Sequence, residues 1–218
     1  MTLVQLDADG VGRIAAALRS GDPVVIPFPT PLPYAVAATA ATTVNEAKGR
    51  PRGQPAGVLL DRHDRGWTRH INLAPESLDL ALWVGEVDMA NLLLPVLPSA
   101  PDWMLNAAEK GFIGITLAWL EHTESLGAEF GHLFVSSGNR TSDRPAVSAA
   151  EAEEVFGTSM LILDGDTARD HTVQHGSATM LRVDSNGSLC LVRPGINDQS
   201  FDDQASYLAD LRARYDRR

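Results

Sequence analysis

The sequence predicts an α/β protein with a twisted, open, mixed sheet and flanking helices. Three observations lead to this class. Short apolar runs typical of strands are interleaved with amphipathic helical segments along the 218 residues. The connections between them vary in length, which argues against a repeating βαβ array. Residues 178–195, "ATMLRVDSNGSLCLVRPG", place two such runs around Asn186-Gly187, the strongest hairpin signal in the chain.

The N-terminal part predicts two helices and two strands around a proline-rich loop. Residues 10–21 carry one apolar face and end at a glycine, as an amphipathic helix does. Residues 23–28, "PVVIPF", favour a short buried strand, and three prolines make 28–34 a fixed non-helical loop. Residues 35–47 are small and favour a helix, and residues 56–61, "AGVLLD", favour a strand.

The central part continues the alternation. Residues 75–94 favour one or two helices, with Pro75 at a start. Residues 111–119, "GFIGITLAW", are β-branched and apolar, which indicates a strand. Residues 120–131 favour a helix, and 132–137, "HLFVSS", favour a strand that runs into a polar loop.

The C-terminal part predicts two helices besides the hairpin. A capping box of Ser148 and Glu151 predicts a helix that closes on the next glycine. Residues 159–166 favour a strand. The last segment has acids early and arginines late, which suits the helix dipole. We expect one domain over residues 1–199, and a C-terminal helix over 200–218 that either packs on it or lies free.

Composition excludes several classes of protein. The formal charge is −10, which disfavours non-specific binding of nucleic acid. The single cysteine, Cys190, excludes an internal disulfide and zinc sites built on several thiolates, and its alternation with leucines predicts a buried strand position. No segment has the roughly 18 continuous apolar residues of a membrane helix, and the N-terminus does not resemble a signal peptide. We therefore expect a cytoplasmic protein.

The stretch "NEAKGRPRGQP", residues 45–55, places Lys48, Arg50 and Arg52 within five positions. Residues 48–70 hold six cations and two acids, a local charge of +4, so the rest of the chain carries −14. This island indicates either a site for a small anion or a solvated basic face. Lysine offers a point charge and arginine a planar fork, and both suit phosphate oxygens. We expect this stretch to be a polar loop, whose substitution leaves the fold intact.

Three other patterns each allow a site or a plain turn. The loop "SSGNRTSD", residues 136–143, could cradle a phosphate or ribose, or satisfy its own polar groups. Asp164 and Asp166 could hold a magnesium ion or close a turn after a strand. His171 and His175 have metal-ligand spacing only in a helix and lack an evident third ligand, so we predict no protein metal site.

Taken in order, four stretches resemble the YrdC/Sua5 family of threonylcarbamoyl-AMP synthases. "KGRPRGQPAGVLL" is similar to the family's Lys-x-Arg-Pro signature, and "VSSGNRTS" to its Ser-x-Asn loop. "AAEAEEVFGTSMLILDGD" looks like the helix and strand that follow. "SATMLRVDSNGSLCLVRPG" resembles the closing Ser-Thr hairpin. The resemblance covers roughly residues 8–197.

This resemblance implies a nucleotidyltransferase that joins L-threonine, bicarbonate and ATP, with Mg²⁺, into threonylcarbamoyl-AMP and pyrophosphate. That product feeds the modification of adenosine 37 in tRNA. The implied contacts are Lys48 and Arg50 on the phosphates as catalytic residues, Ser137, Asn139, Thr179 and Arg193 on the nucleotide, and Thr30 on the amino acid. The partners are then small molecules, without tight tRNA binding and without a membrane. The oligomeric state stays open.

The chain departs from the family pattern mainly around the amino-acid loop. Phe28 stands where the family has a threonine, Thr116 where it has an arginine, and Ala178 where it has a serine. Three hypotheses therefore remain: an active threonylcarbamoyl-AMP synthase, a same-fold enzyme with another amine or carbamoyl donor, and a non-catalytic nucleotide- or RNA-binding relative.

Overall fold

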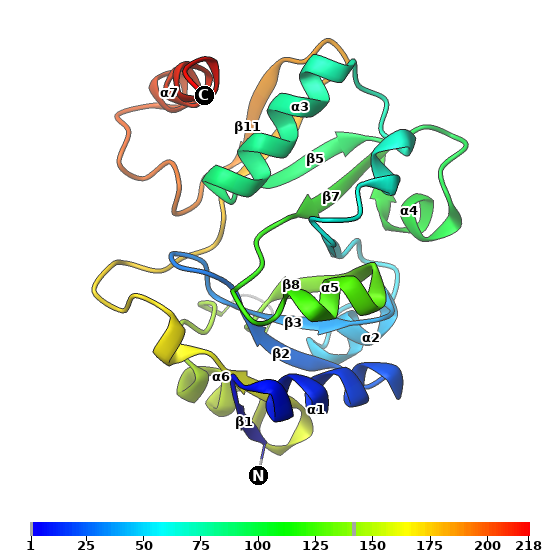
Figure 1. Ribbon diagram of the computed structural model, residues 1–218, viewed down its shortest axis with the longest axis vertical. Coiled ribbons are helices and arrows are strands. Elements are labelled where there is room, and N and C mark those ends of the chain that lie inside the picture. Colours follow the sequence, from blue (N-terminus) through cyan, green and yellow to red (C-terminus); the bar gives the residue numbers. More distant parts are fainter. Residues whose placement is uncertain (1, 141–142) are drawn as a thin grey trace. The chain divides into compact units, whose positions relative to one another are not determined.

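The computed structural model describes residues 2–140 and 143–218 and divides into two compact units. The first unit combines residues up to His63 with Trp119–Ser177. The second combines Asp64–Ala118 with Ala178–Arg218. Neither unit is continuous in sequence, and each has its own helices around its own strands (Figure 1).

The first unit holds six strands, in the order β1-β9-β2-β3-β8-β4. β1 and β2 each pair with β9 in parallel, whereas the pairs β2–β3, β3–β8 and β4–β8 are antiparallel. The mixed sheet predicted from the variable connections is therefore confirmed. The strands are β1 (Leu3–Gln5), β2 (Val24–Pro27), β3 (Tyr34–Ala38), β4 (Gly57–Leu60), β8 (His132–Ser137) and β9 (Leu161–Asp164).

The second unit holds the other strands, in the order β7-β5-β10-β11 with β6 on β7. β5 and β10 are parallel, and the remaining pairs are antiparallel. The hairpin predicted around Asn186-Gly187 is β10–β11, and Gly187 has the positive φ of 81° that such a turn requires. The strands are β5 (Asn91–Pro95), β6 (Ala108–Glu109), β7 (Phe112–Thr116), β10 (Met180–Val183) and β11 (Leu189–Arg193).

Four helices belong to the first unit: α1 (Ala8–Arg19), α2 (Ala41–Ala47), α5 (Glu124–Phe130) and α6 (Ala149–Phe156). α1 begins where the Asp7 carboxylate accepts from the amide of Gly10. Its buried stripe of Val11, Ile14 and Leu18 packs against β9 and β2. In α6, Ser148 caps the amide of Glu151, but the Glu151 carboxylate accepts from Val147, so half of the predicted capping box forms.

The second unit contains α3 (Pro75–Trp83), α4 (Asp102–Ala107) and α7 (Gln204–Asp216). α3 continues into a π-helical turn, Val84–Asp88. Shorter 3₁₀ turns lie at Gly66–His70 in this unit, and at Gly157–Ser159 and Asp166–Ala168 in the first. In the described parts of the chain, no helix is long and apolar enough to cross a membrane.

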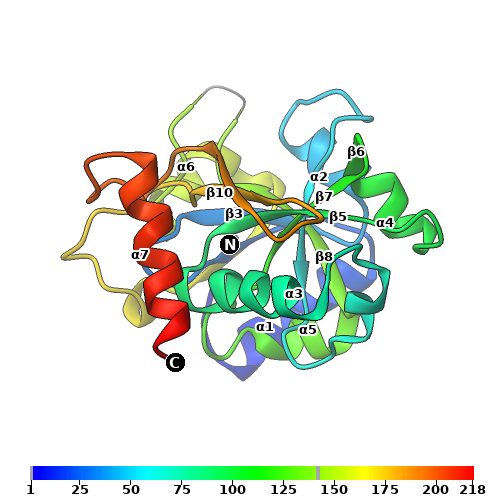
Figure 2. The same cartoon turned by 90° about the horizontal axis from the view of Figure 1, so that it is seen from above.

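The C-terminal helix packs on its own unit. The hydroxyl of buried Tyr207 donates to the Asp88 carboxylate at 2.6 Å, and Arg214 donates to the other Asp88 oxygen at 2.6 Å. Tyr215 meets Trp83 edge to face, with ring centroids 5.8 Å apart. Figure 2 shows α7, in red, next to an end of α3. Of the two alternatives left open for this helix, packing is the correct one.

Two expected helices are partly wrong. Residues 35–47 contain a strand before the helix, because Tyr34–Ala38 pairs on both edges, with β2 and with β8, and is buried throughout. Residues 75–94 end as strand β5 rather than helix, after Met89 turns the chain with a φ of 55°. In both cases small or apolar residues suit a helix and a doubly paired strand equally well.

Candidate phosphate-binding site

The basic stretch after α2 is shaped by backbone turns and by one buried amide. Lys48 ends α2, and Gly49 takes a positive φ of 67° that turns the chain away from the helix. The Asn45 side chain, which is buried, donates to the carbonyls of Arg52 at 3.1 Å and Gln54 at 2.7 Å. This amide holds the stretch in place against α2.

Lys48 is buried, with an exposed fraction of 2%. Its ammonium donates to the carbonyl of Ser137, to Asn139 Oδ1 at 3.0 Å and to Ser137 Oγ at 3.4 Å. Ser137 Oγ in turn donates to Asn139 Oδ1 at 2.6 Å. The stretch lies in a loop between α2 and β4, as expected, but the Lys48 side chain is buried because its long stem reaches across to the end of β8.

Arg50 reaches the same end of β8. Its guanidinium donates to Ser136 Oγ at 2.5 Å. Among the residues that the structure describes, neither Lys48 nor Arg50 has a carboxylate partner. Burial, and then the charge of Arg50, lowers the pKa of Lys48 to about 7, and burial also lowers the pKa of Arg50. Two neighbouring cations without a carboxylate partner in the described chain are a candidate site for an anion.

The loop after β8 is partly a self-satisfied turn. The Asn139 amide donates to the carbonyls of Arg140 at 2.9 Å and Asp143 at 2.7 Å. Gly138 permits a close approach, since a Cβ there would lie 2.8 Å from the Tyr34 carbonyl oxygen. Residues 141 and 142 of the predicted loop lie outside the described part of the chain.

Three of the other four cations of the basic island form ion pairs, and the fourth, Arg69, is exposed and donates to His70 Nε2 at 3.1 Å. Arg52 pairs with Glu46 at 2.5 Å, Arg62 with Glu124, and Arg65 with Glu86 at 2.5 Å. These pairs fit the solvated-face reading of the island. The anion-site reading therefore narrows to Lys48 and Arg50.

Thr30 lies in the first unit but belongs to another network. Its Oγ1 accepts from the Asp170 amide at 2.8 Å. The neighbouring Phe28 is buried, so its ring joins the core of the unit instead of facing a ligand. Within this loop, Thr30 is the side chain whose hydroxyl can still donate to a ligand, because the Tyr34 hydroxyl already donates to Asp166.

Thr179 and Arg193 lie in the second unit. Thr179 is fully buried: its amide donates to Asn197 Oδ1 at 2.9 Å, and its hydroxyl donates to the Asp198 carboxylate. Arg193 donates to the Ala178 carbonyl at 3.3 Å. Thr179 and Arg193, which were both predicted to contact the nucleotide, are thus hydrogen-bonded to groups of their own unit.

Solved structures resemble this chain across most of its length. Sua5 from P. abyssi, solved with L-threonine, superposes with a TM-score of 0.63 at 19% identity over 88% of this chain and 56% of that one. YciO from E. coli gives 0.64 at 13% identity over 89% and 94%. HypF, solved in a phosphate- and nucleotide-bound form, gives 0.61 at 16% identity over 87% and 29%.

The chain has a YrdC/Sua5-like fold. It spans 60% and 56% of the length of the two P. abyssi Sua5 chains that it matches. No protein-family model matches the sequence, and no curated protein matches it. The fold inferred from the four short sequence stretches is confirmed, although identity to these structures is 13–19%.

On this YrdC/Sua5-like fold, Asp164, the last residue of β9, and Asp166 close a turn. Asp164 accepts from the Asp166 amide at 3.1 Å, and Asp166 accepts from the Tyr34 hydroxyl at 2.6 Å. Both contacts favour the turn over a magnesium site. His171 and His175 lie outside any helix, and no group of three candidate metal ligands occurs in residues 2–140 and 143–218. Cys190 is in strand β11 but only half-buried.

Sequence reasoning missed three residues that shape the YrdC/Sua5-like first unit. Asn45 lies in α2, as predicted, but the sequence did not reveal that its side-chain amide fixes the basic stretch. Tyr34 was placed at the end of a loop, and Arg169 was not singled out. A lone tyrosine or arginine in such a context carries no motif, and only the pairing of distant segments reveals its role.

Proposed function

We propose that the chain binds ATP and is a threonylcarbamoyl-AMP synthase-like nucleotidyltransferase. The observation that carries the proposal is the pair of cations, Lys48 and Arg50, that meet at the end of β8 without a carboxylate partner in the described chain. A triphosphate supplies the missing negative charge. The fold, shared with Sua5 solved with L-threonine, supports the same assignment.

The chemistry needs charge neutralisation more than acid–base groups. An amine and bicarbonate form a carbamate with loss of water. A carbamate oxygen then attacks the α-phosphorus of ATP. The bond from that phosphorus to the oxygen that bridges to the β-phosphate breaks, and pyrophosphate leaves. Lys48 and Arg50 would bind phosphate oxygens and stabilise the charge that develops on the pyrophosphate. Mg²⁺ held by the triphosphate itself would add to this neutralisation.

The remaining proposed contacts are weaker. Ser137 and Asn139 already bind the Lys48 ammonium, so they would contact the nucleotide as part of that cluster. Thr179 donates its hydroxyl to Asp198 and can still accept a hydrogen bond. Thr30 would donate its hydroxyl to the amino acid, because its Oγ1 already accepts from Asp170.

Replacement of Arg50 by alanine is expected to weaken ATP binding by about 1–3 kcal/mol, the scale of a charge-assisted hydrogen bond. Its partner, Ser136, is not fully buried and can bind water instead, so the melting temperature should stay the same. Calorimetric titration with ATP and Mg²⁺ measures the affinity, and a thermal melt measures the melting temperature. A melting temperature lowered by several degrees would instead show that Arg50 stabilises the fold.

A second candidate, a same-fold enzyme with another amine, is favoured by loop 28–34. Three prolines remove three backbone donors, and Phe28 replaces a hydroxyl. A site with few donors loses its main means of preferring a hydroxylated substrate. We expect weak selectivity for L-threonine over apolar amino acids of similar size.

Bicarbonate-dependent release of pyrophosphate from ATP, measured with each of the twenty amino acids, tests the function. A response to several small amino acids supports the proposed enzyme and its relaxed selectivity. An exclusive response to threonine contradicts the relaxed selectivity. If ATP binds but none of the twenty amino acids gives a response, another co-substrate or a binding role replaces the proposal.

A further inference from the structure

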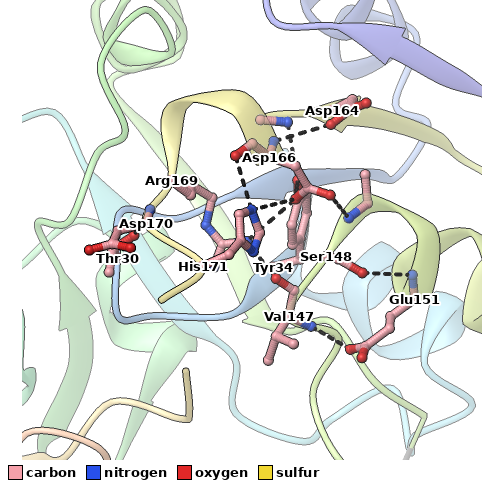
Figure 3. A network of polar contacts seen from close by, with 12 residues as sticks. Thr30, Tyr34, Val147, Ser148, Glu151, Asp164, Asp166, Arg169, Asp170 and His171 are labelled. Atoms are coloured by element: carbon pink, nitrogen blue, oxygen red, sulfur yellow. Dashed lines mark hydrogen bonds and ion pairs between the residues drawn. The ribbon is translucent and has the colours of Figure 1, made fainter. Parts of the chain in front are cut away.

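Two loops of the first unit are joined by a buried polar network (Figure 3). One is the proline-rich loop 28–34, which carries Thr30. The other is the segment 165–176 that follows β9. Figure 3 shows Arg169 and Asp166 of the second loop beside Tyr34, with Thr30 next to Asp170. The network is separate from the contacts of Lys48 and Arg50.

Arg169 is the side chain of segment 165–176 that reaches both loop 28–34 and Val147. It is buried, with an exposed fraction of 6%. Its guanidinium donates to the Val147 carbonyl at 2.8 Å and to the Leu32 carbonyl, and it lies over the Tyr34 ring at 4.8 Å from the centroid. One planar fork thus holds two chain segments and an aromatic face, which a lysine cannot do.

Asp166 completes the charge balance. Its carboxylate lies 3.8 Å from Arg169 and accepts from the Tyr34 hydroxyl at 2.6 Å and from the Ala149 amide at 3.0 Å. The Tyr34 hydroxyl also accepts from the Gly165 amide at 3.1 Å. Burial, followed by Asp166, raises the pKa of Tyr34, so the hydroxyl keeps its proton and the hydrogen bond persists across the working pH range.

The same two loops meet through backbone groups around the candidate substrate residue. The Asp170 amide donates to Thr30 Oγ1 at 2.8 Å, and the Gly176 amide donates to the Pro31 carbonyl at 3.0 Å. The bond from Asp170 uses one lone pair of Thr30 Oγ1 and leaves the hydroxyl hydrogen free to be donated to another group. The orientation of Thr30 therefore depends on where segment 165–176 is held, and Arg169 holds that segment.

We propose that Arg169 is a positioning residue, which fixes loop 28–34 against segment 165–176 and thereby sets the affinity for the amine substrate. The substrate part of this inference rests on the proposed function. Small displacements of a positioning group can cost up to about 100-fold in rate. Loss of Arg169 should therefore raise the KM for the amino acid about 10-fold or more, while the KM for ATP stays the same.

The experiment compares Arg169→Met and Arg169→Lys with the control Arg19→Met. Arg19 is 57% exposed and pairs with Glu129 at 2.6 Å, so the control removes an arginine from the same unit outside the network. Amide hydrogen exchange of Asp170 and Gly176 reports the clamp directly, because both amides donate into loop 28–34. Pyrophosphate release at varied amino acid and varied ATP reports the two KM values.

The expected result is faster exchange at both amides and a raised amino-acid KM in Arg169→Met, with a partial effect in Arg169→Lys and none in the control. Unchanged exchange, or equal rises in both KM values, overturns the inference. If Arg169→Met fails to fold, Tyr34→Phe, which keeps the ring and removes only the hydroxyl, must show the same faster exchange. If the wild-type chain responds to no amino acid, the proposed function and the substrate part fail, while exchange still decides the clamp.

Discussion

Replacement of Lys48 by methionine should weaken ATP binding about 10- to 100-fold at pH 6 and reduce the dependence of that binding on pH. In the wild-type chain the ammonium is buried and its pKa is lowered to about 7, first by burial and then by Arg50. It therefore loses its charge as pH rises through neutrality. ATP affinity should fall between pH 6 and pH 8.5, because a neutral amine binds phosphate far less strongly.

Stability should change with pH in the opposite direction. The pKa of Lys48 is 10.5 when unperturbed and about 7 in the fold, so between these values the unfolded chain binds one proton more. The contribution of Lys48 to the free energy of unfolding then rises with pH across this window. Below pH 7 both states are protonated, and the cost of the buried charge is fully present. Lys48→Met lacks the Lys48 contribution to both trends.

Calorimetric titration with ATP at pH 6, 7 and 8.5, beside urea unfolding at the same pH values, measures both. Arg52→Met is the matched control, because Arg52 lies in the same basic stretch but is 78% exposed and paired with Glu46. It should bind ATP as the wild type does. If Lys48→Met binds ATP with wild-type affinity at every pH, Lys48 is no phosphate ligand.

The second large effect is expected for Asp88→Ala. This carboxylate accepts from the buried Tyr207 hydroxyl and from Arg214, both at 2.6 Å, and so anchors α7. Its loss leaves a buried hydroxyl and a half-buried guanidinium without that acceptor. The free energy of unfolding should fall by about 2–4 kcal/mol.

Urea unfolding and amide exchange of α7 measure this loss. Asp216→Ala is the control, since Asp216 pairs with Arg212 at 3.8 Å on an exposed face, where such pairs contribute little. A loss below about 0.5 kcal/mol in Asp88→Ala would mean that packing alone holds the helix.

The sequence predicted elements best where local chemistry is specific. The Asn186-Gly187 hairpin, the Ser148 cap and the apolar stripe of α1 each depend on neighbours within a few residues, and each formed as expected. Residues 35–38 were misassigned because alanine and valine do not reveal whether partners lie on both sides. That information belongs to β2 and β8, and β8 lies about one hundred residues further along the chain.

For the candidate site, short motifs predicted which residues meet but not how they are buried. Lys48 and the Ser137–Asn139 loop contact each other, as the resemblance implied they would share a site. The burial of Lys48 could not be predicted, because its contacts are with Ser137 and Asn139, far along the chain. The role of Asn45 could not be predicted, because it depends on how the chain turns back after Gly49. The roles of these residues toward nucleotide stay predictions.

The interleaved order of the two units has a consequence for synthesis on the ribosome. The first unit is complete in sequence at Ser177, whereas β5 of the second still awaits its parallel neighbour β10. Translation from Val96 through Val183 adds 88 residues, which takes about 4–18 seconds at ordinary elongation rates. During that time the β10-facing edge of Asn91–Pro95 has no strand to cover it, and such an edge invites pairing with other chains. Fast elongation through codons 96–183 would shorten this exposure and favour a soluble product.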